Sequence, residues 1–313
     1  MDKLFVGVDV SKDFLDIAIA GACRTERIAN TRSEILAWLD SRRGEVELLA
    51  FEPTGGHERL LRRLVEEAGV SLVRVHPNEI VAFRKAKGLK AKTDRIDARL
   101  IAEFARDEIS TRALAPPVRG DEILRELIAR RRQLGLALHA ERCRQDLAAG
   151  RTIKASIKKL IKALGQALKV IEDEIAAHIA RSKSLSARAA NLRTLKGVGP
   201  ITVATLLGEL PELGCLSGKQ IAALVGLAPR TQESGTMRWR ARTGHGRPGV
   251  RAVLFNAARC AIQHNAYFRA FYLHLVNDNR RPGKVALVAV MRKLLVTLNA
   301  MARENKPWRF AQP

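Results

Sequence analysis

Residues 4–20 of the chain, LFVGVDVSKDFLDIAIA, decide the fold of its N-terminal part. Two apolar runs, residues 4–10 and 14–20, are separated by the polar residues 11–13, a pattern that predicts two strands joined by a short turn. Asp9 lies inside the first run. An ionised carboxylate in an apolar strand is costly unless it is paired or binds a metal ion, so Asp9 is the first candidate site residue. An acceptor in a turn at the strand end is the alternative role.

The residues that follow this hairpin alternate between predicted strands and predicted helices. With the hairpin, their order is strand-strand-strand-helix-strand-helix-strand, which indicates an α/β domain that opens with a meander. The Pro-rich break at residues 114–117 ends this domain. Strands are predicted over residues 24–29, 46–51 and 70–75, and helices over residues 33–42, with Ser33 as the N-cap, and 57–68.

The rest of the chain is predicted to be mainly helical. Two long helices are expected over residues 121–180, and apolar residues in the second recur with an eleven-residue repeat, which is typical of a long, nearly straight helix. A dimer contact, an RNA or DNA clamp, or an ordinary helical hairpin with a solvated lysine face are all open roles for this arm. Three domains are therefore predicted: an α/β domain over residues 1–115, a helical coiled connector over 116–190, and a mostly α-helical domain over 191–313.

Composition points to a polyanionic partner. The 313 residues include 55 Lys and Arg against 32 Asp and Glu, a net charge of +23. A surface this basic attracts nucleic acid, and an anionic membrane surface is the alternative. The apolar run at residues 285–302 contains Arg292 and Lys293, which indicates a helix of a soluble protein rather than a membrane span. The four cysteines form no CxxC pair, so neither a zinc site nor a disulfide framework is expected. A cytoplasmic location is therefore expected.

Three further acids stand out by position. Glu52 directly follows the predicted strand over residues 46–51, and strand ends in α/β sheets are where ligands bind. Asp94 and Asp97 are three residues apart on one face of a predicted helix. Four carboxylates that face one another repel unless a cation lies between them. Asp9, Glu52, Asp94 and Asp97 therefore predict a site for two Mg²⁺ or Mn²⁺ ions about 3.5–4 Å apart, an arrangement that cleaves phosphodiesters.

These acids also have structural alternatives. Glu52 is suited to a hydrogen bond ahead of the next helix, and Asp94 and Asp97 to an N-cap and a first-turn acid. The actin-like ATPases also begin with a strand, an Asp and a hairpin, but this chain lacks their later Gly-rich nucleotide loops. Basic residues around the last two acids favour a phosphate substrate, and they include Lys85, Lys87, Lys90, Lys92 and Arg95.

Two segments of the C-terminal part predict nucleic-acid contacts. Residues 195–201, LKGVGPI, have the form of a helix-hairpin-helix turn, in which Gly197 and Gly199 let backbone N–H groups approach a phosphate. An ordinary glycine turn is the alternative. Residues 229–249 form a Gly- and Arg-rich segment that suits a phosphate-lined cleft, with a solvated flexible loop as the alternative. Its candidate phosphate-binding residues are Arg230, Arg238, Arg240, Arg242 and Arg247.

Three segments, GVDVSKDFLDIAI, FEPTGGHERLL and KAKTDRIDARLIAEFA, resemble the motif blocks of the DEDD-type insertion-sequence transposases (the IS-one-ten family), which are described as bridge-RNA-guided recombinases. The resemblance runs over nearly the whole chain. It implies a RuvC-like N-terminal domain with an RNase H fold, in which Asp9, Glu52, Asp94 and Asp97 are the metal ligands.

The same resemblance changes the interpretation of Ser234. Local sequence alone indicates a Ser-Gly turn, because a serine nucleophile needs a base or a metal and none is near in sequence. The resemblance implies that Ser234 attacks a phosphodiester and holds the DNA as a phosphoserine. It also implies an active site shared between the subunits of a dimer or larger oligomer.

Three functions follow from the sequence. The first is a transposase that recombines donor and target DNA with a divalent metal, a serine nucleophile and a structured guide RNA. The second is a RuvC-like Holliday-junction or structure-selective nuclease that uses water. The third is a DNA-binding protein without enzymatic activity.

Overall fold

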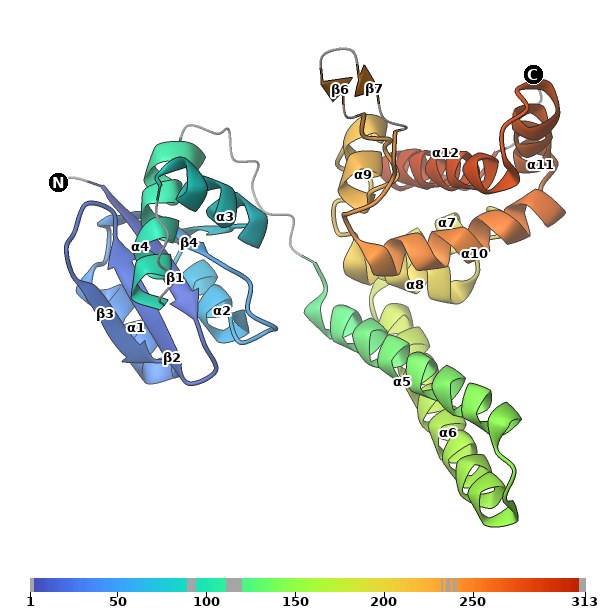
Figure 1. Cartoon of the computed structure of the whole chain (residues 1–313), viewed down its shortest axis with the longest axis horizontal. Helices are drawn as coiled ribbons and strands as arrows, with labels where there is room; N and C mark the ends of the chain where they lie inside the picture. Colours follow the sequence, from blue (N-terminus) through green and yellow to red (C-terminus); the bar gives the residue numbers. More distant parts are fainter. Residues whose placement is uncertain are drawn as a thin grey trace. The chain divides into compact units, whose positions relative to one another are not determined.

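A computed structural model describes residues 3–88, 94–110, 120–231, 233–234, 237–238 and 241–309 of the chain (Figure 1). The chain divides into two compact units, Met1–Pro116 and Pro117–Pro313. The N-terminal unit is built on a mixed sheet, and the C-terminal unit is mostly helical.

The five-stranded sheet has the order β3-β2-β1-β4-β5. The first three strands form an antiparallel meander, and β4 and β5 continue the sheet parallel to β1. The predicted order of elements along the chain and the opening meander are confirmed. The strands are β1 (Leu4–Val10), β2 (Phe14–Ile19), β3 (Thr25–Ala29), β4 (Val46–Phe51) and β5 (Ser71–Arg74).

Helices cover both faces of this sheet, because its central strands are apolar on both sides. One core joins Val6, Val8 and Phe51 of the sheet to α1 and α2, and the other joins Leu48 and Ala50 to α3 and α4. The helices are α1 (Arg32–Ser41), α2 (Arg59–Glu67), α3 (Pro77–Ala86) and α4 (Asp94–Phe104), which continues into a π-helical turn, η1 (Ala105–Ile109).

The N-cap of α1 corrects one detail of the sequence analysis. Ser33 was expected at this position, but α1 begins at Arg32 and Thr31 is its N-cap. Thr31 Oγ1 lies 3.3 Å from Ser33 Oγ, and the Thr31 side chain makes no capping hydrogen bond. Thr and Ser are both common N-cap residues, so local sequence does not distinguish Thr31 from Ser33.

The predicted long helices are confirmed as α5 (Glu122–Leu147) and α6 (Arg151–Arg181), which pack as a hairpin. Of the apolar repeat in α6, Ile175 is buried against the core of the unit, whereas Ile153 and Leu160 are exposed. The repeat therefore packs mainly near the base of the arm.

The remaining helices of the C-terminal unit surround one apolar core to which α8, α10 and α12 contribute most. They are α7 (Lys183–Arg193), α8 (Pro200–Glu209), α9 (Gly218–Val225), α10 (Pro248–His264), α11 (Ala266–Leu273), the π-helical turn η2 (His274–Asp278) and α12 (Gly283–Glu304).

By length and composition, α12 is the one helix among the described residues that is apolar enough to cross a membrane. Val290, Leu294 and Leu298 of this helix are fully buried in the core of the unit. The ammonium of Lys293 lies 4.0 Å from the ring centroid of Phe271. These contacts are those of a core helix.

Candidate active site

Asp9 and Glu52 occupy matching positions on neighbouring strands. In the parallel pairing of β1 with β4, Gly7 faces Ala50 and Val8 faces Phe51, so the next step of this register sets Asp9 beside Glu52. Glu52 directly follows the last residue of β4, and both acids are half-buried. Residues opposite one another in a sheet share a face, so the two carboxylates belong to one face at the carboxyl edge.

Helix α4 brings its first turn to the same edge. A Cβ atom on Gly7 would lie only 2.3 Å from the carbonyl oxygen of Ala98, so α4 packs directly on β1 at this glycine. Phe5, nearer the start of β1, packs into the cluster that contains Phe104 and Ile109, at the far end of the helix. Helix α4 therefore runs antiparallel to β1, and Asp94–Asp97 lie toward the end of the strand that carries Asp9 (Figure 1).

Asp97 is engaged by an arginine. The Arg84 guanidinium in α3 donates a hydrogen bond to Asp97 Oδ1, and each side chain is only 14% exposed. The side chain of Asp94 lies outside the described residues. Among the described side chains, no group of three or more His, Cys, Asp and Glu forms a metal-binding cluster. Carboxylate oxygens are the donors that Mg²⁺ and Mn²⁺ prefer, so the donor chemistry of these acids fits such an ion. The positive charge of Arg84 beside Asp97 would compete with it.

The loop after Glu52 is fixed by Glu58, which the sequence analysis did not single out. Glu58 Oε2 accepts hydrogen bonds from Thr54 N at 3.2 Å and Gly56 N at 2.9 Å. Burial by itself raises the pKa of Glu58, but backbone N–H groups and the charge of Arg74 outweigh it, so the pKa lies below its usual value. The position of Glu52 therefore depends on an ionised carboxylate six residues later.

Asn30 connects the two strand ends that carry the acids. Its Nδ2 donates to Ser11 O at 3.0 Å, just after β1, and to His57 O at 3.1 Å, in the loop after Glu52. A single amide side chain therefore fixes the distance between the two backbone segments. The sequence gives no signal for this role, because the three residues are far apart in the chain.

A fifth acid lies beside Asp9. Asp16 of β2 is the register partner of Asp9, and it is only 5% exposed. Arg27, its partner on β3, donates to both Asp16 carboxylate oxygens, at 3.0 and 2.7 Å. In the sequence, Asp16 lies within the second predicted apolar strand, residues 14–20.

The basic residues predicted near these acids differ in their surroundings. Lys85 is exposed at the end of α3. Lys87 forms ion pairs with Glu103 and Asp107. These acids raise the pKa of Lys87, and the hydrogen bond to Glu103 is the largest cause. The Lys87 ammonium also lies 4.7 Å from the Phe83 ring centroid. Lys90, Lys92 and the side chain of Arg95 lie outside the described residues.

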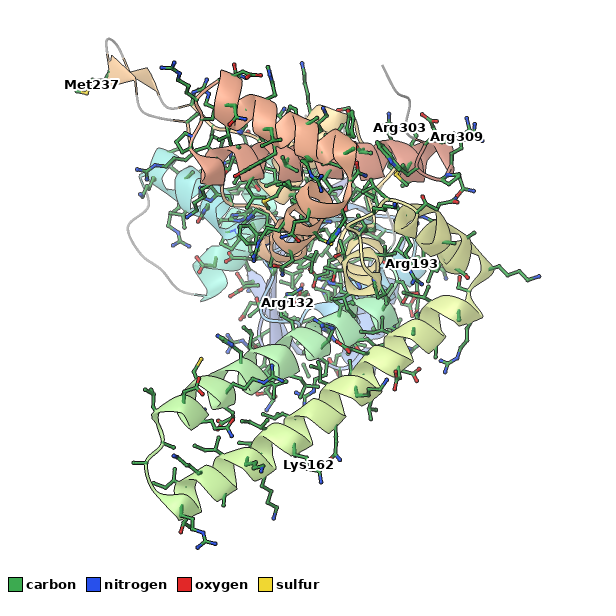
Figure 2. All side chains as sticks on the ribbon, turned by 90° about the vertical axis from the view of Figure 1, so that its right-hand side faces the viewer. Arg132, Lys162, Arg193, Met237, Arg303 and Arg309 are labelled. Carbon is green, nitrogen blue, oxygen red and sulfur yellow. The ribbon has the colours of Figure 1, made fainter. Side chains whose placement is uncertain are left out.

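Ser234 belongs to a β-hairpin. Strands β6 (Glu233–Ser234) and β7 (Met237–Arg238) pair antiparallel, with Ser234 opposite Met237. The loop expected over residues 229–249 thus contains a short hairpin that projects beyond α9, and Met237 of β7 is labelled in Figure 2 (Figures 1 and 2). Ser234 is the last residue of β6, and its side chain lies outside the described residues.

The base of this hairpin is closed by two glycines. A Cβ atom on Gly226 would lie 2.3 Å from His245 O, and one on Gly246 would lie 2.4 Å from Leu224 O. Both glycines have positive φ, at 82° and 63°. No other residue fits this close crossing without a shift of the backbone, so the path of the chain to Ser234 and back is defined at its origin.

The arginines of the hairpin segment separate into exposed and engaged residues. Arg230 and Arg242 are exposed and pair through their backbones, with N···O distances of 3.0 and 3.2 Å. Arg247 instead donates to both oxygens of Glu212, at 2.6 and 2.5 Å. The side chains of Arg238 and Arg240 lie outside the described residues. Within this segment, Arg230 and Arg242 are thus the exposed arginines among the described residues.

The two glycines of the predicted helix-hairpin-helix turn have different surroundings. Gly197 has a φ of 107°, and a Cβ there would lie 2.7 Å from the backbone of Ala261 in α10. Packing alone therefore requires Gly197. Gly199 is exposed, has no heavy atom within 4 Å of an added Cβ, and is the N-cap of α8. Of the two, Gly199 is the more exposed, and Gly197 is only partly exposed.

Two family models and two curated relatives match this chain. A model described as Transposase IS116/IS110/IS902 family matches residues 189–273, and a DEDD transposase model of IS110 elements, described as Transposase, matches residues 6–147. The chain is 26% identical to the pilin gene-inverting proteins of Moraxella bovis and Moraxella lacunata, over 98% of this chain and 98% of each relative. The matched regions contain the four acids and Ser234.

Proposed function

Because the chain belongs to the IS116/IS110/IS902 family of transposases and is a DNA recombination enzyme, we propose that it cleaves and exchanges DNA strands with a divalent metal and a serine nucleophile. The observation that carries this proposal is the β1–β4 register. It sets Asp9 beside Glu52 at the edge where the first turn of α4, which contains Asp94 and Asp97, lies.

The N-terminal unit is proposed to be a RuvC-like domain with an RNase H fold. The strand order β3-β2-β1-β4-β5 with helices on both faces is compatible with this fold. Asp9, Glu52, Asp94 and Asp97 would hold Mg²⁺ or Mn²⁺ through carboxylate oxygens. When bound, the metal would polarise the scissile phosphate and stabilise the charge on the attacking and leaving oxygens.

Ser234 is the proposed nucleophile. Its Oγ would attack phosphorus, forming a serine phosphodiester while the bond from phosphorus to one sugar oxygen breaks. The serine proton is transferred, through a base or water, to that leaving oxygen, which becomes a free hydroxyl. Attack by a hydroxyl of another strand would reverse these bonds and rejoin the DNA.

Arg230 and Arg242, with Arg238, Arg240 and Arg247, are proposed to neutralise DNA phosphates near Ser234. Residues 116–190 would serve as the connector between the acidic and serine-bearing domains. The active site would combine domains from different subunits of a dimer or larger oligomer, with a structured RNA as guide. The location is proposed to be cytoplasmic. The relatives' name, pilin gene-inverting protein, is consistent with exchange of strands within one DNA.

The experiment compares the wild-type protein with Asp9→Asn and Ser234→Ala variants on DNA ends, with Mg²⁺ and the folded noncoding RNA that flanks the gene. We expect cleavage and a covalent protein–DNA adduct only for the wild type. Full cleavage by Ser234→Ala without an adduct would support the alternative, a RuvC-like nuclease that uses water. Unchanged cleavage by Asp9→Asn would exclude both enzymes as proposed.

A further inference from the structure

A row of charged residues crosses the sheet at the level of Asp9. From β3 to β1, the register aligns Arg27 with Asp16 and Asp16 with Asp9, and one further step leads to Glu52 after β4. Ala18, two residues from Asp16 on the same strand, packs with Ala98 and Ala102 of α4. Since alternate residues of a strand share a face, Asp16 and Asp9 both belong to the face that α4 covers.

Two carboxylates directly opposite one another on neighbouring strands are destabilising. Asp16 is 5% exposed, so water screens its charge poorly. Arg27 compensates for it with two parallel hydrogen bonds of 3.0 and 2.7 Å, the geometry in which arginine binds a carboxylate most strongly. The Arg27 guanidinium lies 5.7 Å from the Phe14 ring centroid, which further restricts its position.

We infer that Arg27 and Asp16 are positioning residues for Asp9: their neutral pair sets the charge next to the candidate metal site and fixes the strand that borders it. This inference rests on the proposed metal-dependent function. With the pair intact, Asp16 and Arg27 together add no net charge beside Asp9. Removing either partner changes the net charge beside Asp9 by one unit, and the sign of the change depends on which partner is lost.

The opposite signs give the inference a test that a purely structural ion pair would not pass. In Asp16→Asn, the cationic Arg27 is left beside Asp9 and competes with a divalent cation. In Arg27→Gln, the anionic Asp16 is left there and attracts a cation. In the double variant Asp16→Asn/Arg27→Gln, the two amides can still hydrogen-bond and no net charge is added. A structural pair predicts loss of stability in both single variants, with no opposite effects on metal affinity.

The experiment measures Mn²⁺ binding to the full chain by calorimetry and by electron paramagnetic resonance, with thermal unfolding of each variant in parallel. Asp9→Asn identifies binding at the candidate site. We expect the Mn²⁺ dissociation constant to rise about tenfold in Asp16→Asn, to fall several-fold in Arg27→Gln, and to return within about threefold of wild type in the double variant.

Glu26 supplies the matched control, because it is the neighbour of Arg27 on β3, points to the other face, and pairs with Arg42 at 2.5 Å. Glu26→Gln should change stability but not Mn²⁺ affinity. Equal affinities in the wild type and the folded Asp16→Asn and double variants would overturn the inference while leaving the metal site in place. If wild type and Asp9→Asn both fail to bind Mn²⁺, the proposed metal site is itself contradicted and the inference fails with it.

Discussion

Glu58 illustrates how a single residue outside the acidic motif supports it. Its carboxylate accepts two backbone N–H groups of the loop that follows Glu52. We expect Glu58→Gln to lower the free energy of unfolding by about 1 kcal/mol at pH 7, because a charge-assisted hydrogen bond is replaced by a neutral one. Urea unfolding of the two proteins measures this difference. Glu67→Gln, on the exposed side of α2, should have a smaller effect.

The pH dependence of this difference has a defined sign. The pKa of Glu58 is lowered in the folded state, so its contribution is fully present above the unfolded pKa, about 4.3 for Glu. It is lost as the pH falls through the folded pKa. The wild type and Glu58→Gln should therefore converge in stability below about pH 4. A difference that stays constant from pH 7 to pH 3 would contradict the assigned hydrogen bonds.

Arg84 makes a second prediction at the residue scale. Its ion pair with Asp97 competes with any cation that uses Asp97 as a ligand. In Arg84→Met, removal of the positive charge should tighten Mn²⁺ binding about threefold to tenfold. Calorimetric titration measures the affinity, with Arg63→Met on the exposed face of α2 as the control. An unchanged or weaker affinity in a folded Arg84→Met protein would mean that Asp97 is not a metal ligand.

At the scale of elements, the hairpin β6–β7 depends on the crossing of two glycines. In Gly246→Ala, the added Cβ would lie 2.4 Å from Leu224 O, and the alanine would have to adopt a φ of 63°. The clash and the backbone strain would both destabilise the folded state. We expect a loss of about 2–3 kcal/mol in unfolding free energy. Gly199→Ala, with an ordinary φ and open space, is the matched control and should lose about 1 kcal/mol or less. Urea unfolding measures both variants. Equal losses of unfolding free energy in Gly246→Ala and Gly199→Ala would mean that the close crossing at Gly246 is not required for stability.

The arm α5–α6 carries a prediction about nucleic acid. Three lysines are exposed at four-residue intervals on α6, namely Lys154, Lys158 and Lys162. In Figure 2, Lys162 points away from α5. If this face contacts a phosphate backbone, changing all three to Gln should lower the slope of log K against log salt by about 2–3. Fluorescence anisotropy with duplex DNA and folded RNA measures the slope. Lys169→Gln is the control, since Lys169 pairs with Asp173, and an unchanged slope in the triple variant leaves the arm without a backbone contact.

The sequence predicted the residues and elements whose signal is local. Asp9 and Glu52 stand out because each interrupts or ends an apolar strand, and the register places them side by side. The row that includes Asp16 and Arg27 could not be predicted in this way, because it depends on pairing between three strands. The hairpin at Ser234 was missed for a similar reason. The base of its segment is closed where Gly226 meets Gly246, which lie twenty residues apart.

At the scale of the whole molecule, the net charge of +23 is distributed over two units with different chemistry. The N-terminal unit holds the acids at one sheet edge, and the C-terminal unit holds Ser234 on a hairpin beside exposed arginines. The long helices join the second unit because Leu124 and Ile128 of α5 are buried in its core. Sequence periodicity identified the helices, but long-range packing decides which core they share.

The central claim is that Ser234 carries the DNA after cleavage, and the most direct measurement is the identity of the attached residue. Wild-type protein is reacted with DNA ends, Mg²⁺ and the flanking RNA, the DNA is digested by nuclease, and the peptides are analysed by mass spectrometry. We expect a nucleotide or phosphate remnant on Ser234, absent from the Asp9→Asn protein. Cleaved DNA with no adduct, or an adduct on another residue, would contradict the claim.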